Sequence, residues 1–192
     1  MPPTFILASR SPRRVAYLRE AGYAFDCCPA DVPEVPGIGE PAADYALRVA
    51  HAKAQAALLL HPALMALGAD TDVVRDGRIL GKPRDADDAT AMLMSLSGRT
   101  HQVISAVVLL CPTRRESALT ITEIDFTPFT EAEAHAYVRT GEPDGKAGAY
   151  GIQGAAARFV RAVRGSYTGV VGLPMAETCT LLTRFGIHPV HP

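Results

Sequence analysis

The sequence predicts an α/β protein built on a mixed, twisted sheet that is flanked by helices. Three observations indicate this class. An apolar run at 5–8 meets a well-marked helix start, and a strand-like run at 23–27 follows, which gives a strand, helix, strand opening. A two-residue hairpin signal and two long runs rich in Val, Ile and Thr add antiparallel strands. The 192 residues are 48% hydrophobic, enough to bury one core, so we expect a single domain over 1–192.

Composition and charge argue against several other classes of protein. The formal net charge is −1, so we expect no nucleic-acid partner, and any phosphate site must be a local cluster. No apolar run approaches membrane length, so we expect a cytoplasmic protein without a membrane partner. The four cysteines lack C-x-x-C spacing and flanking His residues, which argues against a zinc site or a disulfide framework.

The first helix begins with an unusual pair of cations. Ser11 is placed to be an N-cap whose hydroxyl accepts from a first-turn amide, and Pro12 fits the first helical position. Arg13 and Arg14 then lie at the positive end of the helix dipole, which is unfavourable by roughly 0.3–1 kcal/mol each unless an anion is near. A phosphate held by orphan amides, by the hydroxyls of Ser9 and Ser11, and by the arginines would explain them; two solvated arginines are the alternative.

The loop expected over 29–41 carries acidic residues just behind the second strand. It is rich in Pro, Gly and acids. Asp31 and Glu34 are candidate metal ligands because they follow the strand beside the basic cluster. Ordinary loop acids in water are the alternative.

The alanine-rich run from 41 to about 60 predicts a long helix. The residues of the 3.6-residue stripe expected to face the core are Tyr45, Val49, Ala52, Ala56 and Leu60. Lys53 lies beside this stripe. Its ammonium therefore either reaches out to water or points into an anion site.

A buried strand at 64–69 is expected to present Asp70 and Thr71 at its C-terminal end, where open α/β sheets gather ligand groups. The segment 73–80 then has Asp-Gly at its centre and predicts a type I′ hairpin. Continuing the hairpin register places Thr71 opposite Lys82, with Asp70 next to it. We therefore expect Asp70 and Lys82 to be neighbours.

The rest of the chain supplies a scaffold and one glycine-rich loop. The expected elements are a helix over 85–96, strands over 101–111 and 119–126, a helix over 130–140 with a capping box, and a last amphipathic helix after Pro174. His101 is expected to be a polar residue at a strand edge rather than a catalytic one. The segment 146–154 permits close backbone approach, as a ligand loop needs, but it matches neither a Walker loop nor a dinucleotide fingerprint.

Several separated motifs, considered together, identify a family. They are LASRSPRR, VAHAKA, GADTDVV with GKPRD, SGRTHQV, KAGAYGIQG and GSYTGVVGLP, in this order and over almost the whole chain. In combination they resemble the Maf family of nucleoside triphosphate pyrophosphatases, which hydrolyse the bond between the α and β phosphates with a divalent metal. The resemblance implies two lobes with a central cleft, as in Maf and inosine triphosphatase proteins, and a cytoplasmic enzyme that often forms a homodimer.

The resemblance also implies roles for individual residues. It carries the catalytic role onto Asp70 and the metal onto Asp70 and Glu34, with Mg²⁺ or Mn²⁺ as the ion. The implied substrate-binding residues are Ser9, Arg13, Arg14, Lys53 and Lys82. Whether Asp70 is a general base or a metal ligand stays open, because one carboxylate can orient water while it binds the ion.

Three positions distinguish the subgroups of the family, and here they are Arg13, Thr71 and Gln153. This set resembles the dTTP/UTP subgroup rather than the 7-methyl-GTP subgroup. The Gln amide offers a donor and an acceptor that suit the O4 and N3–H edge of thymine or uracil. Asp72 stands where the family more often has an apolar residue.

Other functions stay open from the sequence. Hydrolysis of 7-methyl-GTP or of another modified nucleotide is one alternative. A nucleotide-binding regulator of cell division, which would bind without turnover, is another. Acids beside a triphosphate pocket favour an enzyme, because they are unfavourable there unless a metal lies between them and the phosphates.

Overall fold

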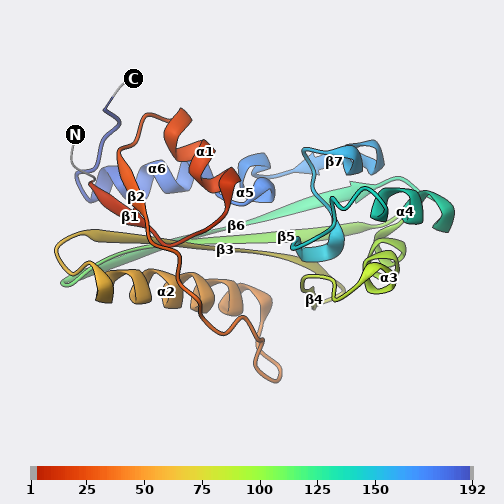
Figure 1. Ribbon diagram of the computed structural model, residues 1–192, viewed down its shortest axis with the longest axis horizontal. Helices are drawn as coiled ribbons and strands as arrows, with labels where there is room; N and C mark the ends of the chain where they lie inside the picture. The colour runs from red at the N-terminus through yellow and green to blue at the C-terminus, as the bar shows by residue number, and fades with distance from the viewer. Residues whose placement is uncertain (1–3, 191–192) are drawn as a thin grey trace.

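The strands and helices follow the order that the sequence predicts, with β7 and α5 as additions (Figure 1). The structure is a computed structural model that describes residues 4–190, so the ends of the expected domain, at 1–3 and 191–192, lie outside the described residues. The strands are β1 (Phe5–Leu7), β2 (Phe25–Cys27), β3 (Met65–Arg75), β4 (Arg78–Leu80), β5 (Thr100–Cys111), β6 (Arg114–Phe126) and β7 (Val160–Arg164). The α-helices are α1 (Pro12–Glu20), α2 (Ala42–Leu60), α3 (Ala86–Leu96), α4 (Glu131–Val138), α5 (Tyr167–Val171) and α6 (Met175–Arg184). Short 3₁₀ turns span Ala147–Ala149 and Ala155–Phe159.

The sheet is mixed, which confirms the predicted fold class. Its strand order is β2-β1-β3-β5-β6-β7, and β4 pairs with β3 outside this path. β1 lies parallel to both β2 and β3, whereas the pairs from β3 to β7 are antiparallel. The long strands β3, β5 and β6 run through the length of the molecule (Figure 1).

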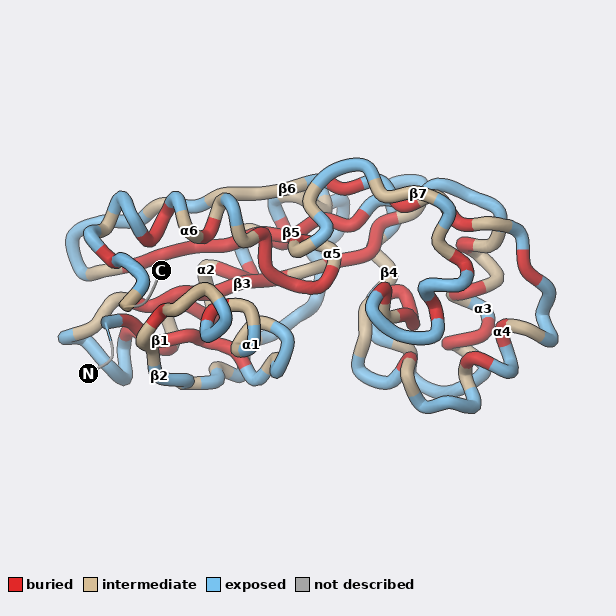
Figure 2. The backbone as a smooth tube through the Cα atoms, turned by 90° about the horizontal axis from the view of Figure 1, so that it is seen from above, coloured by how far each residue is buried: buried red, intermediate tan, exposed pale blue. Residues whose placement is uncertain are grey.

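Helices cover the sheet differently at its two ends. At one end, α2 lies on one face, and α1 and α6 lie on the other (Figure 1). At the opposite end, α3 and α4 gather around β4 and β7, and Figure 2 shows the two groups apart, joined by the sheet. This arrangement confirms the expected two lobes.

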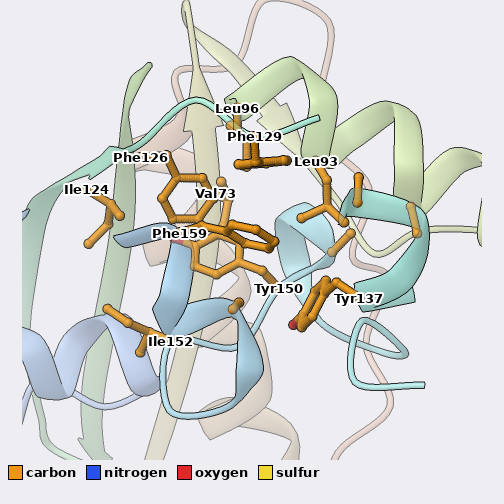
Figure 3. Packing of buried hydrophobic residues seen from close by; sticks show 14 of the residues in the cluster. Val73, Leu93, Leu96, Ile124, Phe126, Phe129, Tyr137, Tyr150, Ile152 and Phe159 are labelled. Atoms are coloured by element: carbon orange, nitrogen blue, oxygen red, sulfur yellow. The ribbon is translucent and has the colours of Figure 1, made fainter. Parts of the chain in front are cut away.

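The second lobe has its own aromatic core (Figure 3). The rings of Phe129 and Phe159 stack with their centroids 4.1 Å apart. Phe126 meets Tyr150 edge to face at 5.0 Å between centroids. Such ring pairs stabilise the fold beyond the apolar area that they bury, so this lobe is a rigid support for the loops around it.

The buried face of α2 agrees with the prediction at Tyr45 and Val49 and differs at the other three positions. Ala52 and Ala56 are only partly buried, and Leu60 is 69% exposed. The alanines that the helix buries instead are Ala46, Ala50, Ala54 and Ala57. The reason is a close approach to β3: a Cβ added at Gly68 would lie 2.1 Å from the carbonyl oxygen of Ala50. Only alanine-sized side chains fit against the sheet at this point.

The predicted hairpin register is confirmed. Val73 pairs with Leu80, and Arg75 pairs with Arg78. Asp76 and Gly77 both have positive φ, of 50° and 75°, as a type I′ turn requires. β3 does not end before Asp70 as expected, however, but continues to the turn as one strand.

The helix ends agree with the sequence at three places and differ at one. Asp85 caps α3 by accepting from the amide of Asp88, and Thr130 with Glu133 forms the expected capping box of α4. Gly22 has a φ of 78° just after α1. The Ser11 hydroxyl makes no capping hydrogen bond, contrary to the prediction.

Candidate active site

A cavity of about 970 Å³ lies between the two lobes. It is lined by segments that are far apart in sequence: 8–14, 29–34, 70–73, 81–82, 145–154 and 170–172, among others. The sheet creates it, because β1 stops at Leu7, beside Leu67, while β3 continues to Arg75. Asp70 and Thr71 are thus in the middle of β3 and not at its end, yet they lie past the carboxyl end of the parallel strand β1.

Two lysines and two acids form a continuous ionic network in the cavity. Lys53 Nζ lies 2.7 Å from Asp70 Oδ1 and 2.6 Å from Glu34 Oε1. Lys82 Nζ lies 2.7 Å from the other oxygen of Glu34. The side chains of Lys53 and Asp70 are each only 10% exposed. Burial opposes ionisation of Glu34, but the two ammonium groups outweigh it and lower the pKa of Glu34 to about 2.

Lys82 reaches this network by a different route from the predicted one. The hairpin pairing does not extend to Thr71 and Lys82 as expected, and among residues 4–190 the ion pair of Lys82 is with Glu34. β4 ends at Leu80, and the carbonyl of Gly81 then accepts from the amide of Gly148, so the chain leaves the hairpin before Lys82. Glu34, a predicted metal ligand, joins the two lysines.

The two arginines in the first turn of α1, Arg13 and Arg14, are anchored to the C-terminal part of the chain. Arg13 Nε donates to the carbonyl of Val171 at 3.0 Å, and Arg14 Nε donates to that of Gly172 at 2.7 Å. Arg14 also donates to Ser9 Oγ at 3.2 Å. Ser9 Oγ further accepts from the amide of Ser11 at 3.1 Å. Burial lowers the pKa of Arg14, although the Asp70 carboxylate acts in the opposite direction. Both arginines thus line the cavity and are fixed by hydrogen bonds, Arg14 partly buried and Arg13 exposed.

Thr71 lies on the face of β3 opposite to Asp70, because successive residues of a strand alternate. Its hydroxyl accepts from Ser105 at 3.0 Å and from Arg14 at 3.3 Å. It also lies 3.3 Å from the carbonyl oxygen of Gly172, to which it donates. The structure thus places this predicted specificity residue against the guanidinium of Arg14.

The glycine-rich segment closes the cavity from the second lobe and brings Gln153 to its lining. Gly148 has a φ of 67°, and a Cβ added there would lie 2.8 Å from Val73. Glu142 holds the segment by accepting from Tyr137 at 2.7 Å and from the amide of Ala155 at 2.8 Å. Gln153 is exposed at this wall, so its amide is open to a ligand.

His101 is not the edge residue that the sequence predicts. It is 2% exposed, and its Nε2 lies 2.8 Å from the hydroxyl oxygen of Tyr150, a residue that lines the cavity. Burial lowers the pKa of His101 to about 4. His101 therefore supports the glycine-rich segment through Tyr150. This contact joins segments far apart in the chain, so no local pattern in the sequence indicates it.

Asp72 is a second buried acid of β3 at the cavity. It is 6% exposed, and its Oδ2 has no hydrogen-bond partner among the described residues. Burial raises the pKa of Asp72 to about 8, and the neighbouring carboxylate of Asp70 acts in the same direction. Asp31, by contrast, pairs with Arg10 at the surface, where both side chains are exposed.

The acids of the cavity fit a divalent cation that is shared with a substrate. Among residues 4–190, no three side chains of His, Cys, Asp or Glu are grouped to hold a metal ion by themselves. Mg²⁺ typically uses only one or two carboxylates, with phosphate oxygens and water completing its shell. Asp70 and Glu34 are hard oxygen donors of this kind, and the Oδ2 atom of Asp72 is a further buried oxygen without a hydrogen-bond partner among the described residues.

The fold and the cavity together define a class: a two-lobed α/β protein whose charged cleft has the size and cations to take an anionic small molecule. The comparison with protein families is more specific. Residues 4–185 match the model described as Maf-like protein, and the chain belongs to the Maf family.

Curated relatives match nearly the whole chain. A protein of Xanthomonas euvesicatoria pv. vesicatoria (strain 85-10) named dTTP/UTP pyrophosphatase is 50% identical over 187 residues, covering 95% of this chain and 98% of the relative. Proteins of the same name from Aromatoleum aromaticum (strain DSM 19018 / LMG 30748 / EbN1) and Anaeromyxobacter dehalogenans (strain 2CP-1 / ATCC BAA-258) are 48% and 50% identical. They cover 94% and 97% of this chain, and the chain covers 94% and 96% of them. Within the described part of the chain, no helix has the length and apolar character needed to span a membrane.

Proposed function

We propose that this chain is a metal-dependent nucleoside triphosphate pyrophosphatase that hydrolyses dTTP and UTP to the monophosphate and pyrophosphate. The observation that carries the proposal is the ionic network in the cavity, where Lys53 and Lys82 are held by Asp70 and Glu34. A triphosphate entering the cavity offers the lysines a stronger anionic partner. The names of the relatives support the same reaction and the same bases.

The residues of the network have distinct roles in this proposal. The substrate phosphates are bound by Ser9, Arg13, Arg14, Lys53 and Lys82. Water adds to the α-phosphorus, the bond from that phosphorus to the α–β bridging oxygen breaks, and pyrophosphate leaves with the oxygen. The cations stabilise the negative charge that develops on the departing pyrophosphate. Asp70 orients and deprotonates the water or holds the metal, and one carboxylate can do both.

A divalent cation, Mg²⁺ or Mn²⁺, would be held by Asp70 and Glu34 and would polarise the phosphate oxygens. Glu34 is occupied by two lysines, and its low pKa keeps it ionised and ready to bind a cation throughout the physiological range. Gln153 would read the base from the glycine-rich wall, while Thr71 and Arg13 act from the opposite wall. Canonical dTTP and UTP, together with modified pyrimidine nucleotides, are the substrates that this set suits. We also propose a cytoplasmic enzyme that forms a homodimer and binds neither nucleic acid nor membrane.

The first test measures pyrophosphate release by the purified chain. The panel contains dTTP, UTP, CTP, GTP and 7-methyl-GTP, each with Mg²⁺, Mn²⁺ or a chelator. We expect metal-dependent release that favours dTTP and UTP. A preference for 7-methyl-GTP would overturn the proposed preference for dTTP and UTP but not the proposed reaction. Binding without any turnover would support the regulatory alternative.

Substitution of Asp70 tests the central assignment. Asp70→Asn keeps the shape of the side chain and removes its charge, so we expect dTTP turnover to fall by at least about 100-fold. Near-normal turnover in saturating Mn²⁺ would show that Asp70 has neither of its proposed roles.

Substitution of Gln153 tests the reading of the base. In Gln153→Glu the amide donor is lost, and we expect kcat/KM for dTTP and UTP to fall by about tenfold or more while Mn²⁺ affinity is unchanged. Equal losses in substrate use and metal binding would contradict base recognition by this residue.

A further inference from the structure

Asp72 presents a buried carboxylate to the cavity that the roles above leave unused. It lies two residues after Asp70 on β3, so both side chains project from the same face of the strand. Asp72 lines the cavity and is 6% exposed, and its Oδ2 is buried without a hydrogen-bond partner. A polar atom in this condition requires a partner, because its interactions with water are lost and none replaces them.

The cations of the cavity are already taken by other groups. Lys53 lies between Asp70 and Glu34, and Lys82 contacts Glu34. Arg14 donates to a serine, a threonine and a backbone carbonyl. Among residues 4–190, no ion pair includes Asp72. The cations of the described residues therefore leave Asp72 without an ion-pair partner, and a bound cation can supply one.

We infer that Asp72 is a direct ligand of the divalent cation, which it shares with Asp70 on one face of β3. This inference rests on the proposed function and adds Asp72 to the ligands given above. Two neighbouring carboxylates and the phosphate oxygens of a nucleotide form the shell of hard oxygen donors that Mg²⁺ and Mn²⁺ accept. The cation would also neutralise the two buried acids in the position where the triphosphate must bind.

A shared proton is the competing explanation for two neighbouring carboxyl groups. In that arrangement Asp72 would be neutral and would donate a hydrogen bond to Asp70. An asparagine at position 72 would keep the donor and the shape but would lose the charge. Asp72→Asn therefore distinguishes a metal ligand from a proton-sharing partner.

The experiment measures Mn²⁺ affinity by electron paramagnetic resonance titration of the full chain. It is done with Mn²⁺ alone and with a dUTP analogue whose α–β bridge is an imido group, so turnover plays no part. We expect Asp72→Asn to weaken Mn²⁺ binding by at least about tenfold in both conditions. The matched control is Glu177→Gln: Glu177 also has a buried, unpartnered oxygen, but it is on α6 outside the cavity lining, and its loss should leave the affinity unchanged.

An affinity within about twofold of the unsubstituted chain would overturn the inference, because loss of a ligand has a larger effect. If Asp72→Asn does not fold, wild-type crystals with Mn²⁺ and the same analogue give the answer. The anomalous peak is expected at coordination distance, about 2.1 Å, from an oxygen of Asp72, and a peak bound only by other residues would refute the assignment. The nucleotide panel is independent of these measurements, so failure of the proposed hydrolysis and failure of the Asp72 assignment are distinguishable.

Discussion

Mild acid should destabilise this protein through one buried side chain, His101. Burial lowers the pKa of its imidazole from 6.5 to about 4, and only 2% of the residue is exposed. In the unfolded chain the imidazole takes up its proton near the ordinary pKa, whereas in the folded protein it does so only near the lowered one. The unfolded state binds more protons between these values, so the free energy of unfolding decreases as the pH falls through this window.

The size of the effect follows from the two pKa values. Linkage gives a loss of about 2 kcal/mol at about pH 5, relative to neutral pH. The loss approaches about 3 kcal/mol once the pH is below the folded-state pKa. Above the ordinary pKa of histidine both states carry a neutral ring, and the full stability is present.

Urea unfolding, monitored by circular dichroism, measures this effect when the unsubstituted chain and a His101 variant are each compared at two pH values. His101→Gln does not titrate and retains an amide that can bond to the hydroxyl of Tyr150. Between about pH 7 and about pH 5 the unsubstituted chain should lose about 2 kcal/mol more than the variant. The contributions of all other titrating groups cancel, so equal losses in the two proteins would refute the explanation.

Two further substitutions test the packing beneath the site. Lys53→Met leaves the buried Asp70 carboxylate without its closest cation, so the free energy of unfolding in urea should decrease by about 3 kcal/mol. Adding Asp70→Asn to this variant should restore part of that stability. If it restores none, the ion pair does not stabilise the fold as argued. Gly68→Ala forces a methyl group to within 2.1 Å of the Ala50 carbonyl oxygen, which must shift α2. We expect a loss of about 3 kcal/mol in the same measurement, against a near-neutral Gly81→Ala control with open space around it, and equal stabilities would contradict this docking.

Local patterns in the sequence predict much of this structure. The hairpin register, the caps at Asp85 and Thr130 and the order of the long strands depend on residues close in sequence. Lys53 and Asp70 are 17 residues apart, and the sequence offers each of them as a site residue on separate grounds; the structure joins them at 2.7 Å.

The differences arise where distant segments decide the outcome. The middle of α2 buries Ala50 and Ala54 because Gly68, a residue of another element, lets the helix approach the sheet closely. Lys82 pairs with Glu34 and not with Asp70, because the carbonyl of Gly81 accepts a hydrogen bond from Gly148, which lies far along the chain. His101 is buried because a tyrosine from the glycine-rich segment folds over it. Periodicity within one element contains no information about such contacts.

Continuity of the long strands restricts how the two lobes can move. β3, β5 and β6 each contribute side chains to the clusters at both ends, and no linker interrupts them. A hinge needs a short segment that absorbs large changes in backbone dihedral angles, and hydrogen-bonded strands do not offer one. The two halves of this molecule are therefore expected to move together as one rigid unit, so that a nucleotide binds without rotation of one lobe against the other.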